Sequence, residues 1–258
     1  MTQLEVIPLR AVQYLPIAVR RTAHAIGRAM GEDGKYYFVK SGLEVELVCA
    51  TEWVCNSIAD SLNLPVPSPK VLQTPEGTLI YGTQEIGPKL PEIEAARILF
   101  GQGGNSIFVP ELANLLSSTY ALDLVIGNLD RHQDNFIISV NGPTGPSPQV
   151  GHIHLIDFGS ADFLQPTKAA LPLPQMSNTV RVGRQIRKAH GFADSAASTL
   201  LSRFKDGRKF LLDRAFFGMP GEWLSKEQRE SFANWIGSVQ FENRLSLIGE
   251  GLSNGKYL

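Results

Sequence analysis

The first forty residues alternate short apolar runs with turn-forming segments, a pattern typical of β-strands. Apolar runs at 4–9 and 23–30 come before an aromatic and β-branched run at 35–40. The last two runs flank Gly-Glu-Asp-Gly at 31–34, and a turn containing Gly and Asp between such runs indicates a β-hairpin. We therefore expect strands in this part of the chain, with Lys40 at the end of one of them.

A long helix is predicted next, over residues 43–62. Leu47, Val54 and Ile58 belong to a set of apolar residues spaced by three and four positions, as one face of an α-helix requires. Three prolines within 65–69 end this helix, because proline lacks the backbone N–H that a helix interior uses.

A second hairpin and a linker follow. The runs at 70–73 and 78–81 flank Pro-Glu-Gly, which predicts two more paired strands. Residues 82–88 show neither the period of a helix nor that of a strand, so we expect a linker there.

Helical periods dominate the rest of the chain. One pair of apolar runs, at 136–140 and 152–156, indicates two paired strands around a turn-rich insert. The predicted helices share apolar spacings of three and four and are separated by glycine or proline. They cover 95–100, 110–125 and most of the chain from 179 onward, with breaks expected at 206–207 and 218–221.

Two polar segments beside these apolar runs carry the candidate chemistry. The first is Gly-Asn-Leu-Asp-Arg-His-Gln-Asp-Asn at 127–135, and the second is His-Leu-Ile-Asp-Phe-Gly at 154–159. Phosphoryl transfer needs a group that orients and deprotonates the acceptor hydroxyl, and oxygen ligands that hold magnesium against a triphosphate. Asp130 can face the acceptor, while Asn135 and Asp157 can reach the metal. The order and separation of the two segments therefore predict a kinase that uses ATP and Mg²⁺.

Lys40 is a candidate for holding the α- and β-phosphates of ATP. Kinases keep such a lysine extended through an ion pair with a glutamate on the following helix. Glu44, Glu46 and Glu52 compete for this role. We choose Glu52, because it lies mid-helix and can face inward, whereas the other two fall in the first turn, where they suit the helix dipole. The alternative for Lys40 is a solvated side chain at a strand end.

The loop that would cradle the phosphates is less clearly marked. The acidic turn at 31–34 is not a Gly-x-Gly-x-x-Gly loop, and it is better explained as the far turn of the hairpin. Backbone amides around 19–23, together with Arg20 and Arg21, are the candidate phosphate contacts. Further nucleotide contacts are assigned to the linker residues, which are Gln84, Glu85 and Ile86.

Other polar residues near the motifs have several possible roles. His132 is a candidate catalytic group beside Asp130, and a phosphate contact or a scaffold of the loop are its alternatives. Asp123 lies in an apolar helix, where we expect it to anchor the backbone of the motif loop. Asp134 is expected to face solvent. His152 and His154 alternate on a strand without further ligands, which argues against a zinc site.

Together, the elements predict an α+β, protein-kinase-like fold with two lobes. Residues 1–88 form a strand-rich N-lobe with the nucleotide-binding strands and one helix. Residues 89–258 form a mainly helical C-lobe with the catalytic loop and the metal-binding hairpin.

Composition limits the classes of partner and the cellular compartment that we expect. The chain has 258 residues and a formal net charge of −1, with a pI near 6.5, so no basic excess points to nucleic acid. Cys49 and Cys55 point to different faces of one predicted helix, which makes a disulfide between them unexpected. No signal peptide and no stretch of transmembrane length are found, so we expect a mature, cytoplasmic protein without membrane insertion.

The motif residues resemble a known family. Asn-Leu-Asp-Arg-His-x-x-Asn at 128–135, followed by Ile-Asp-Phe-Gly at 156–159, is similar to the HipA-like kinases and their relatives, the phosphatidylinositol 3- and 4-kinases. Tyr-Phe-Val-Lys at 37–40, the helix end at 63–67 and Gly-Met-Pro-x-x-Trp at 218–223 favour small bacterial HipA-like domains.

This resemblance covers most of residues 15–250. It implies that Asp130 is the catalytic base, that Asn135 and Asp157 bind magnesium, and that Lys40 contacts the phosphates of ATP. The implied reaction is phosphorylation of a hydroxyl, with Ser or Thr of a protein as the acceptor. The alternatives are a lipid or small-molecule kinase, and a nucleotide-binding pseudokinase that serves as a regulatory module.

Overall fold

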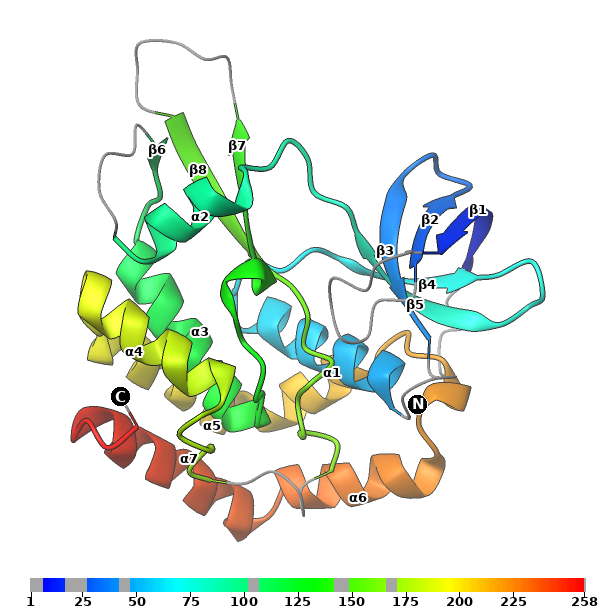
Figure 1. The fold of residues 1–258 in the computed structure, drawn as a ribbon. Coiled ribbons are helices and arrows are strands. Elements are labelled where there is room, and N and C mark those ends of the chain that lie inside the picture. Colours follow the sequence, from blue (N-terminus) through cyan, green and yellow to red (C-terminus); the bar gives the residue numbers. More distant parts are fainter. Residues whose placement is uncertain are drawn as a thin grey trace.

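The computed structural model describes residues 7–16, 27–41, 47–101, 107–141, 149–165 and 171–257. It shows a strand-rich N-terminal part beside a larger, mainly helical part, as the sequence predicts (Figure 1). Among the described residues, no helix has both the length and the apolar character needed to cross a bilayer.

Five short strands form a closed barrel in the N-terminal part. The predicted hairpin at 31–34 is present, since β2 and β3 pair antiparallel around it, and β1 closes the barrel by pairing in parallel with β4. Small and apolar side chains such as Ala29, Leu72 and Ile80 fill the interior. A side chain at Gly82 would meet the end of Leu72, so glycine at this position lets Leu72 fill the barrel. In barrel order, the strands are β1 (Leu9–Pro16), β2 (Gly27–Gly31), β3 (Tyr36–Lys40), β5 (Leu79–Gln84) and β4 (Pro69–Gln73).

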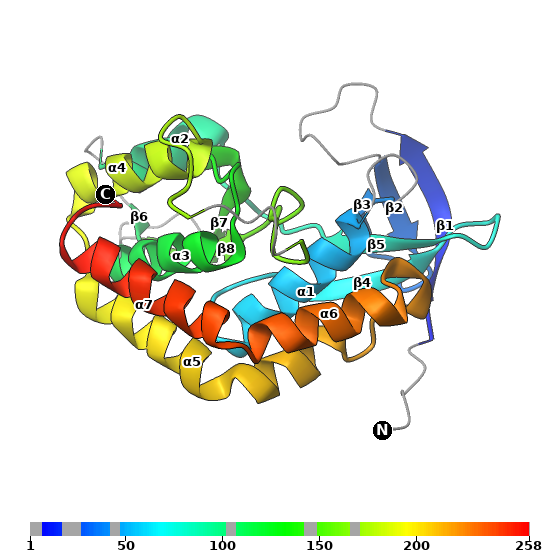
Figure 2. The same cartoon turned by 90° about the horizontal axis from the view of Figure 1, so that it is seen from below.

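Helix α1 (Val48–Ser61) joins the barrel to the helical part. It packs against β4 and β5 on one side and against α5 on the other, and Figure 2 shows it lying next to the helical layer. Its buried residues Val54 and Ile58 belong to the same apolar core as the C-terminal helices, whereas the barrel interior forms a separate, smaller core. The helix of the predicted N-lobe is therefore packed mainly with the C-terminal core.

The helical part surrounds a long buried helix and one small sheet. Helix α3 packs against α4, α5 and α7, and the strands β7 and β8 form the predicted antiparallel hairpin, with β6 alongside β8. The strands are β6 (Ile107–Phe108), β7 (Phe136–Asn141) and β8 (Gln149–Leu155). The helices are α2 (Glu92–Leu99), α3 (Leu112–Ile126), α4 (Asn178–His190), α5 (Asp194–Phe216), α6 (Lys226–Ile236) and α7 (Val239–Ser253), with 3₁₀ turns η1 (Gln133–Asn135) and η2 (Gly221–Trp223).

The predicted break at 206–207 is wrong, because α5 continues through it. Glycine in a helix interior costs about 1 kcal/mol relative to alanine, whereas each large apolar side chain gains about 1.5–3 kcal/mol on burial. Phe204 and Leu211, on either side of Gly207, are both buried. Their packing therefore outweighs the local preference of the glycine, while the break predicted at 218–221 does separate α5 from η2.

Two other predicted boundaries also shift. The linker expected at 82–88 begins later, because Gly82, Thr83 and Gln84 still pair with β3 as the end of β5. The first described strand starts at Leu9, where the sequence pattern placed the end of a strand.

Candidate active site

The motif loop begins where helix α3 ends. Gly127 has a positive φ of 67° and caps α3 in the left-handed conformation, which glycine adopts without a steric penalty. The backbone N–H groups of Gly127 and Asn128 both donate to the carbonyl of Asp123. The chain thus turns sharply out of the helix and into the polar segment.

A buried ion pair holds this loop in place. The Asp123 carboxylate, which is fully buried, accepts hydrogen bonds from Arg131 Nε at 2.9 Å and Arg131 Nη2 at 3.1 Å. It also accepts one from Asn128 Nδ2 at 2.9 Å. Asp123 therefore anchors the loop as the sequence predicts, but mainly through side chains, and Arg131 is a positioning residue to which sequence analysis assigned no role.

Arg131 connects the two motif segments. Its Nη1 donates to the carbonyl of Ile156 at 2.6 Å, directly before Asp157. Its guanidinium carbon also lies 4.8 Å from the centre of the Phe158 ring, within range of a cation–π interaction. The sequence alone shows the order of the two segments, and Arg131 is the physical link between them.

Thr179 of α4 adds a second anchor. Its hydroxyl accepts a hydrogen bond from the backbone N–H of Arg131 at 3.0 Å and donates one to the carbonyl of Asn128 at 2.7 Å. Thr179 is fully buried, so these two backbone groups have no access to water as a replacement partner.

We expect Thr179→Val to lower the free energy of unfolding by about 1–3 kcal/mol, because two buried backbone groups lose their hydrogen bonds while the side-chain shape is kept. Urea denaturation measures this change. The matched control is Thr199→Val on α5, where the exposed hydroxyl bonds to its own helix, and a change within about 0.5 kcal/mol is expected. Equal effects of the two substitutions would contradict the anchoring role of Thr179.

Asp130 lies half-buried at the centre of the loop. One carboxylate oxygen, Oδ1, accepts a hydrogen bond from Asn178 Nδ2 at 2.5 Å, and the backbone N–H of Asp130 donates to Asn128 Oδ1 at 3.2 Å. Asn178 is the first residue of α4, forty-eight positions away in sequence. The orientation of Asp130 thus depends on a residue that local motif analysis does not find.

Asn135 and Asp157 are brought together by the β-hairpin. Asn135 directly precedes β7 and Asp157 follows shortly after β8, and the backbone N–H of Ile156 donates to the Asn135 carbonyl at 3.0 Å. Asp157 has a positive φ of 61°, a conformation that costs energy in residues other than glycine and is often found at functional sites.

The Asn135 and Asp157 side chains fit a magnesium ion by the chemistry of their donors, since Mg²⁺ prefers oxygen ligands. Asn135 Oδ1 accepts the backbone N–H of His132 at 2.9 Å, which leaves this oxygen a second lone pair. Among the described residues, the buried Asn135 Nδ2 has no hydrogen-bond partner, which is unusual for a buried donor.

Lys40 pairs with two carboxylates. Its Nζ forms an ion pair with Glu52 and another with Asp157, at 2.5 Å from Oδ1 of the latter. Glu52 is 1% exposed, and it reaches Lys40 as the fifth residue of α1. Glu44 and Glu46, the competing candidates, lie outside the described residues.

The pKa values of Lys40, Glu52 and Asp157 follow from burial and from the presence of two carboxylates beside one ammonium group. Burial alone would lower the pKa of Lys40, but the two carboxylates outweigh burial and raise it. Burial also raises the pKa of Glu52, and the nearby charge of Asp157 adds to this while Lys40 opposes it. Burial acts in the same direction on Asp157, but the charge and hydrogen bond of Lys40 lower its pKa overall. Asp157 is therefore the carboxylate of this cluster that is most readily kept ionised as a metal ligand.

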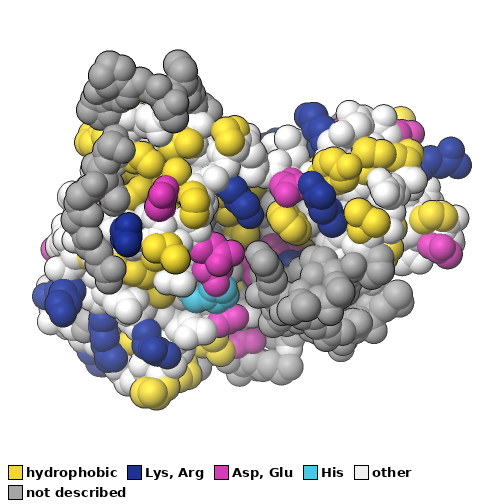
Figure 3. Space-filling view, turned by 45° about the horizontal axis from the view of Figure 1, so that its top comes forward, with side chains coloured by type: hydrophobic (Ala, Val, Ile, Leu, Met, Phe, Trp, Pro, Cys, Tyr) yellow, Lys and Arg dark blue, Asp and Glu magenta, His cyan; other side chains and the backbone are white. Residues whose placement is uncertain are grey.

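Lys40 and Asp157 face a cavity of about 480 Å³ between the barrel and the helical part. Figure 3 shows the hollow from above, with acidic side chains and a histidine near its edge. Lys89, Glu92 and Gln133 also contribute polar groups. The apolar walls, which could receive a planar base, come from both parts of the chain: Phe38, Leu90, Ala95, Phe136, Ile137, Ile138 and Ile156.

The three predicted linker contacts are placed differently. Gln84 lines the cavity, together with its neighbour Thr83. The Glu85 carboxylate accepts a hydrogen bond from Arg28 Nε at 2.8 Å, and its backbone N–H donates to Tyr36, so both groups are already engaged. Ile86 is half-buried and is not among the residues that line this cavity.

The remaining predicted positions fall at the edge of the site or elsewhere. His132 is partly exposed, with Nδ1 at 3.7 Å from a carboxylate oxygen of the more exposed Asp134. The turn at 31–34 is the far end of the β2–β3 hairpin, where Asp33 accepts a hydrogen bond from Tyr37 at 2.7 Å. The predicted phosphate contacts at 19–23, with Arg20 and Arg21, lie outside the described residues.

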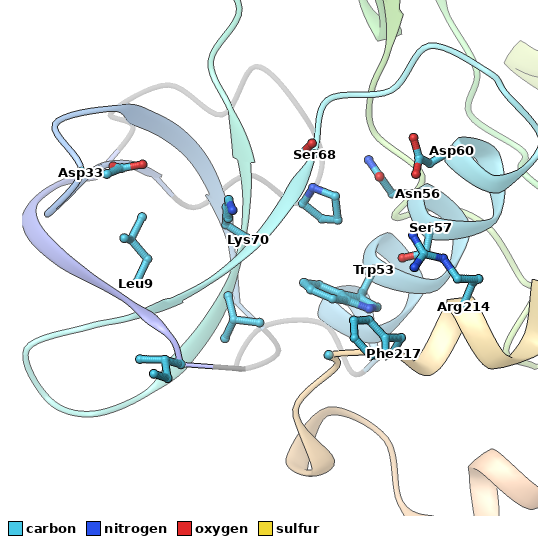
Figure 4. A pocket seen from close by; sticks show the side chains of 14 residues that line it. Leu9, Asp33, Trp53, Asn56, Ser57, Asp60, Ser68, Lys70, Arg214 and Phe217 are labelled. Carbon is cyan, nitrogen blue, oxygen red and sulfur yellow. The ribbon is translucent and has the colours of Figure 1, made fainter. Parts of the chain in front are cut away.

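Another cavity, of about 390 Å³, opens between the barrel, α1 and the end of α5. Figure 4 shows Trp53 and Asn56 of α1 on one side of it, with Leu9 and Lys70 of the barrel on the other. It shares no lining residue with the cavity at Lys40 and contains neither motif segment. The candidate active site is therefore the cavity at Lys40.

These elements define a protein-kinase-like fold, with an ion-paired lysine in the small part and a motif loop in the large part. Residues 28–141 match the family model described as HipA-like kinase. The match includes Lys40, Glu52, Asp130 and Asn135 and ends before Asp157. No curated protein sequence matches the chain.

A solved kinase shares this fold. The structure is similar to a proinflammatory kinase, CtkA, from Helicobacter pylori, with 13% identity, coverage of 95% of this chain and 98% of that chain, and a TM-score of 0.57. It is also similar to HipA of Shewanella oneidensis MR-1, solved in a complex with HipB and operator DNA. That match has 12% identity, covers 95% of this chain and 66% of HipA, and has a TM-score of 0.46. The family model thus matches less than half of the chain, and the similarity to CtkA shows a shared fold.

Proposed function

We propose that this chain transfers the γ-phosphate of ATP, with Mg²⁺, to a Ser or Thr hydroxyl of a protein. The observation that carries the proposal is the position of Lys40. It is ion-paired with both Glu52 and Asp157 on the wall of a cavity that Gln133 and Asp134 of the motif loop also line. Lys40 is thus a cation available for phosphates, in direct contact with Asp157, one of the two proposed metal ligands.

The cavity has the properties that nucleotide binding requires. Its walls are apolar where a base would pack, and its polar groups are concentrated at Lys40 and Asp157. Glu52 keeps the Lys40 ammonium at the cavity wall, and its own burial prevents it from swinging away into solvent. Gln84 and Thr83 provide polar atoms at the end of β5, where the chain passes from one part to the other.

In this proposal Asn135 and Asp157 hold the metal through their side-chain oxygens. Bound magnesium would neutralise charge on the phosphates as the γ-phosphate is transferred. Asp157 contacts Lys40 directly, so metal binding and the placement of Lys40 are expected to be coupled. Asp157, whose backbone is in the left-handed conformation, lines the cavity.

Asp130 is the proposed base for the acceptor hydroxyl. Asn178 donates a hydrogen bond to Oδ1, and no described residue donates one to Oδ2, which is the oxygen that can meet the acceptor. The backbone N–H of His132 donates to Asn135 Oδ1 and so positions a proposed metal ligand, while a part of the His132 imidazole in proton transfer stays a prediction. We propose no nucleic-acid partner, because the formal net charge of the chain is −1.

The proposed function is tested by incubating the purified chain with γ-labelled ATP and a bacterial lysate, with magnesium or with EDTA. We expect magnesium-dependent label on phosphoserine or phosphothreonine, located by mass spectrometry. Label that appears only in the lipid extract would contradict a protein acceptor. Tight ATP binding without any transfer would contradict the kinase proposal and favour a regulatory pseudokinase.

A further inference from the structure

Next to the cavity at Lys40, across the motif loop, lies a second cavity of about 500 Å³, which is distinct from the one at Trp53. Gln133 and Asp134 line both this cavity and the one at Lys40, so the 3₁₀ turn η1 separates the two. Asn178, which holds the Asp130 carboxylate, also lines the second cavity. The second cavity is therefore adjacent to the proposed base, where an acceptor must enter.

Helix α4 forms one wall of this second cavity and is strongly basic. Its 13 residues include four Lys or Arg side chains and no Asp or Glu, although the whole chain has a net charge of −1. The cations are all exposed, whereas Val180, Val182 and Ile186 pack inward. Lys and Arg side chains gather over the helical part at the lower left of Figure 3. The cations of α4 are Arg181, Arg184, Arg187 and Lys188.

The spacing of these cations along α4 gives their distances from Asn178, the residue that contacts the motif loop. An α-helix rises about 1.5 Å per residue, so Arg181 is about one turn, roughly 4.5 Å, along α4 from Asn178. Arg184 is about 9 Å and Lys188 about 15 Å from the same residue along the axis. Asn178 holds the proposed base Asp130, so the phosphorylated hydroxyl is expected near it. An extended peptide advances about 3.3 Å per residue, so a peptide running along α4 would reach these cations about one to five residues from that hydroxyl.

The cavity itself favours a peptide over a flat polyanionic surface. Ala96 and Phe100, beside Val182, give it an apolar floor, while Arg181 and Gln185 stand at the rim on α4. A concave site with an apolar floor and a cation at its edge accommodates an apolar side chain next to an acidic one. A lipid bilayer offers headgroups in a plane and no side chain to enter such a pocket.

We propose that this cavity and the basic face of α4 form the acceptor site, and that the acceptor is a Ser/Thr segment with acidic residues on one side of the hydroxyl. Arg181 is the specificity-determining residue, since it is the cation of α4 that lines the cavity. This inference rests on the proposed kinase function and adds the chemical class of its substrate.

The test uses synthetic Ser peptides that differ in having Asp/Glu or Lys/Arg at the one to five positions on either side of the serine. We expect a higher kcat/KM for acidic peptides with the wild-type chain. Arg181→Glu is expected to raise the KM for acidic peptides about tenfold, which corresponds to about 1.4 kcal/mol, because an attraction becomes a repulsion. Arg181→Gln should give a KM for acidic peptides between those of the wild type and Arg181→Glu. This variant carries no reversed charge, so its intermediate KM rules out a general effect of charge reversal on folding.

Lys209→Glu, on the exposed side of α5, is the matched control, because it makes the same charge change away from the cavity and should retain the wild-type preference. Equal kcat/KM for acidic and basic peptides in the wild-type chain would overturn the inference, and so would transfer only to vesicles containing phosphatidylinositol phosphates. If the wild-type chain transferred phosphate to none of the acceptors, the proposed function itself would be overturned.

Discussion

Asp130→Asn is expected to reduce turnover by about 10²–10⁴-fold, the usual contribution of a general base, while ATP affinity stays nearly constant. Asparagine keeps the size of the side chain but cannot accept the proton of the hydroxyl. Asp130 does not line the cavity at Lys40, so nucleotide binding should not depend on its charge. The loss should therefore appear in kcat, as it does for an interaction made mainly in the transition state.

ATP affinity, melting temperature and peptide phosphorylation should be measured on one preparation of the Asp130→Asn variant. Asp213→Asn on the exposed face of α5 is the matched control, with wild-type values expected for all three. If Asp130 only pinned the loop through Asn178, the variant would melt at a lower temperature and keep partial activity. A stable variant with wild-type turnover would remove Asp130 from the mechanism.

Asp157→Asn should remove the magnesium-dependent part of ATP binding and reduce turnover on the order of 10²–10³-fold, the scale for losing one preorganised electrostatic group. The substitution removes the ionised ligand but preserves its shape. Lys40 keeps its ion pair with Glu52, so the phosphate-binding cation stays in place. The effect should thus be confined to the metal.

Calorimetric titration with ATP, in magnesium and in EDTA, separates the two contributions. Wild type should bind more tightly in magnesium, and Asp157→Asn should bind equally in both buffers, with Asp213→Asn again behaving as wild type. Unchanged affinity of the Asp157→Asn variant for magnesium-ATP would show that the metal is held elsewhere. The assignment of Asp157 would then be withdrawn even if transfer were still slow.

The sequence by itself determined the local elements and the main chemical groups. The β2–β3 hairpin follows from a Gly- and Asp-containing turn between apolar runs, and Lys40 at the end of β3 follows from the same pattern. The two motif segments could be found because their residue types and spacing express a chemical requirement. Glu52 is chosen over Glu44 and Glu46 for a mid-helix position, but α1 begins at Val48, so Glu52 reaches Lys40 as the fifth residue of the helix.

The tertiary structure decided which distant residues hold these groups in place. Arg131, Asn178 and Thr179 make the hydrogen bonds that orient the motif loop, across sequence separations that no local pattern covers. The Glu85 carboxylate accepts a hydrogen bond from Arg28, although Glu85 lies in the predicted nucleotide-binding linker. Helix α5 continues through Gly207 because buried neighbours outweigh local preference. In each case the deciding energy comes from burial and from pairing between segments far apart in the chain, and these contacts exist only once the chain has folded.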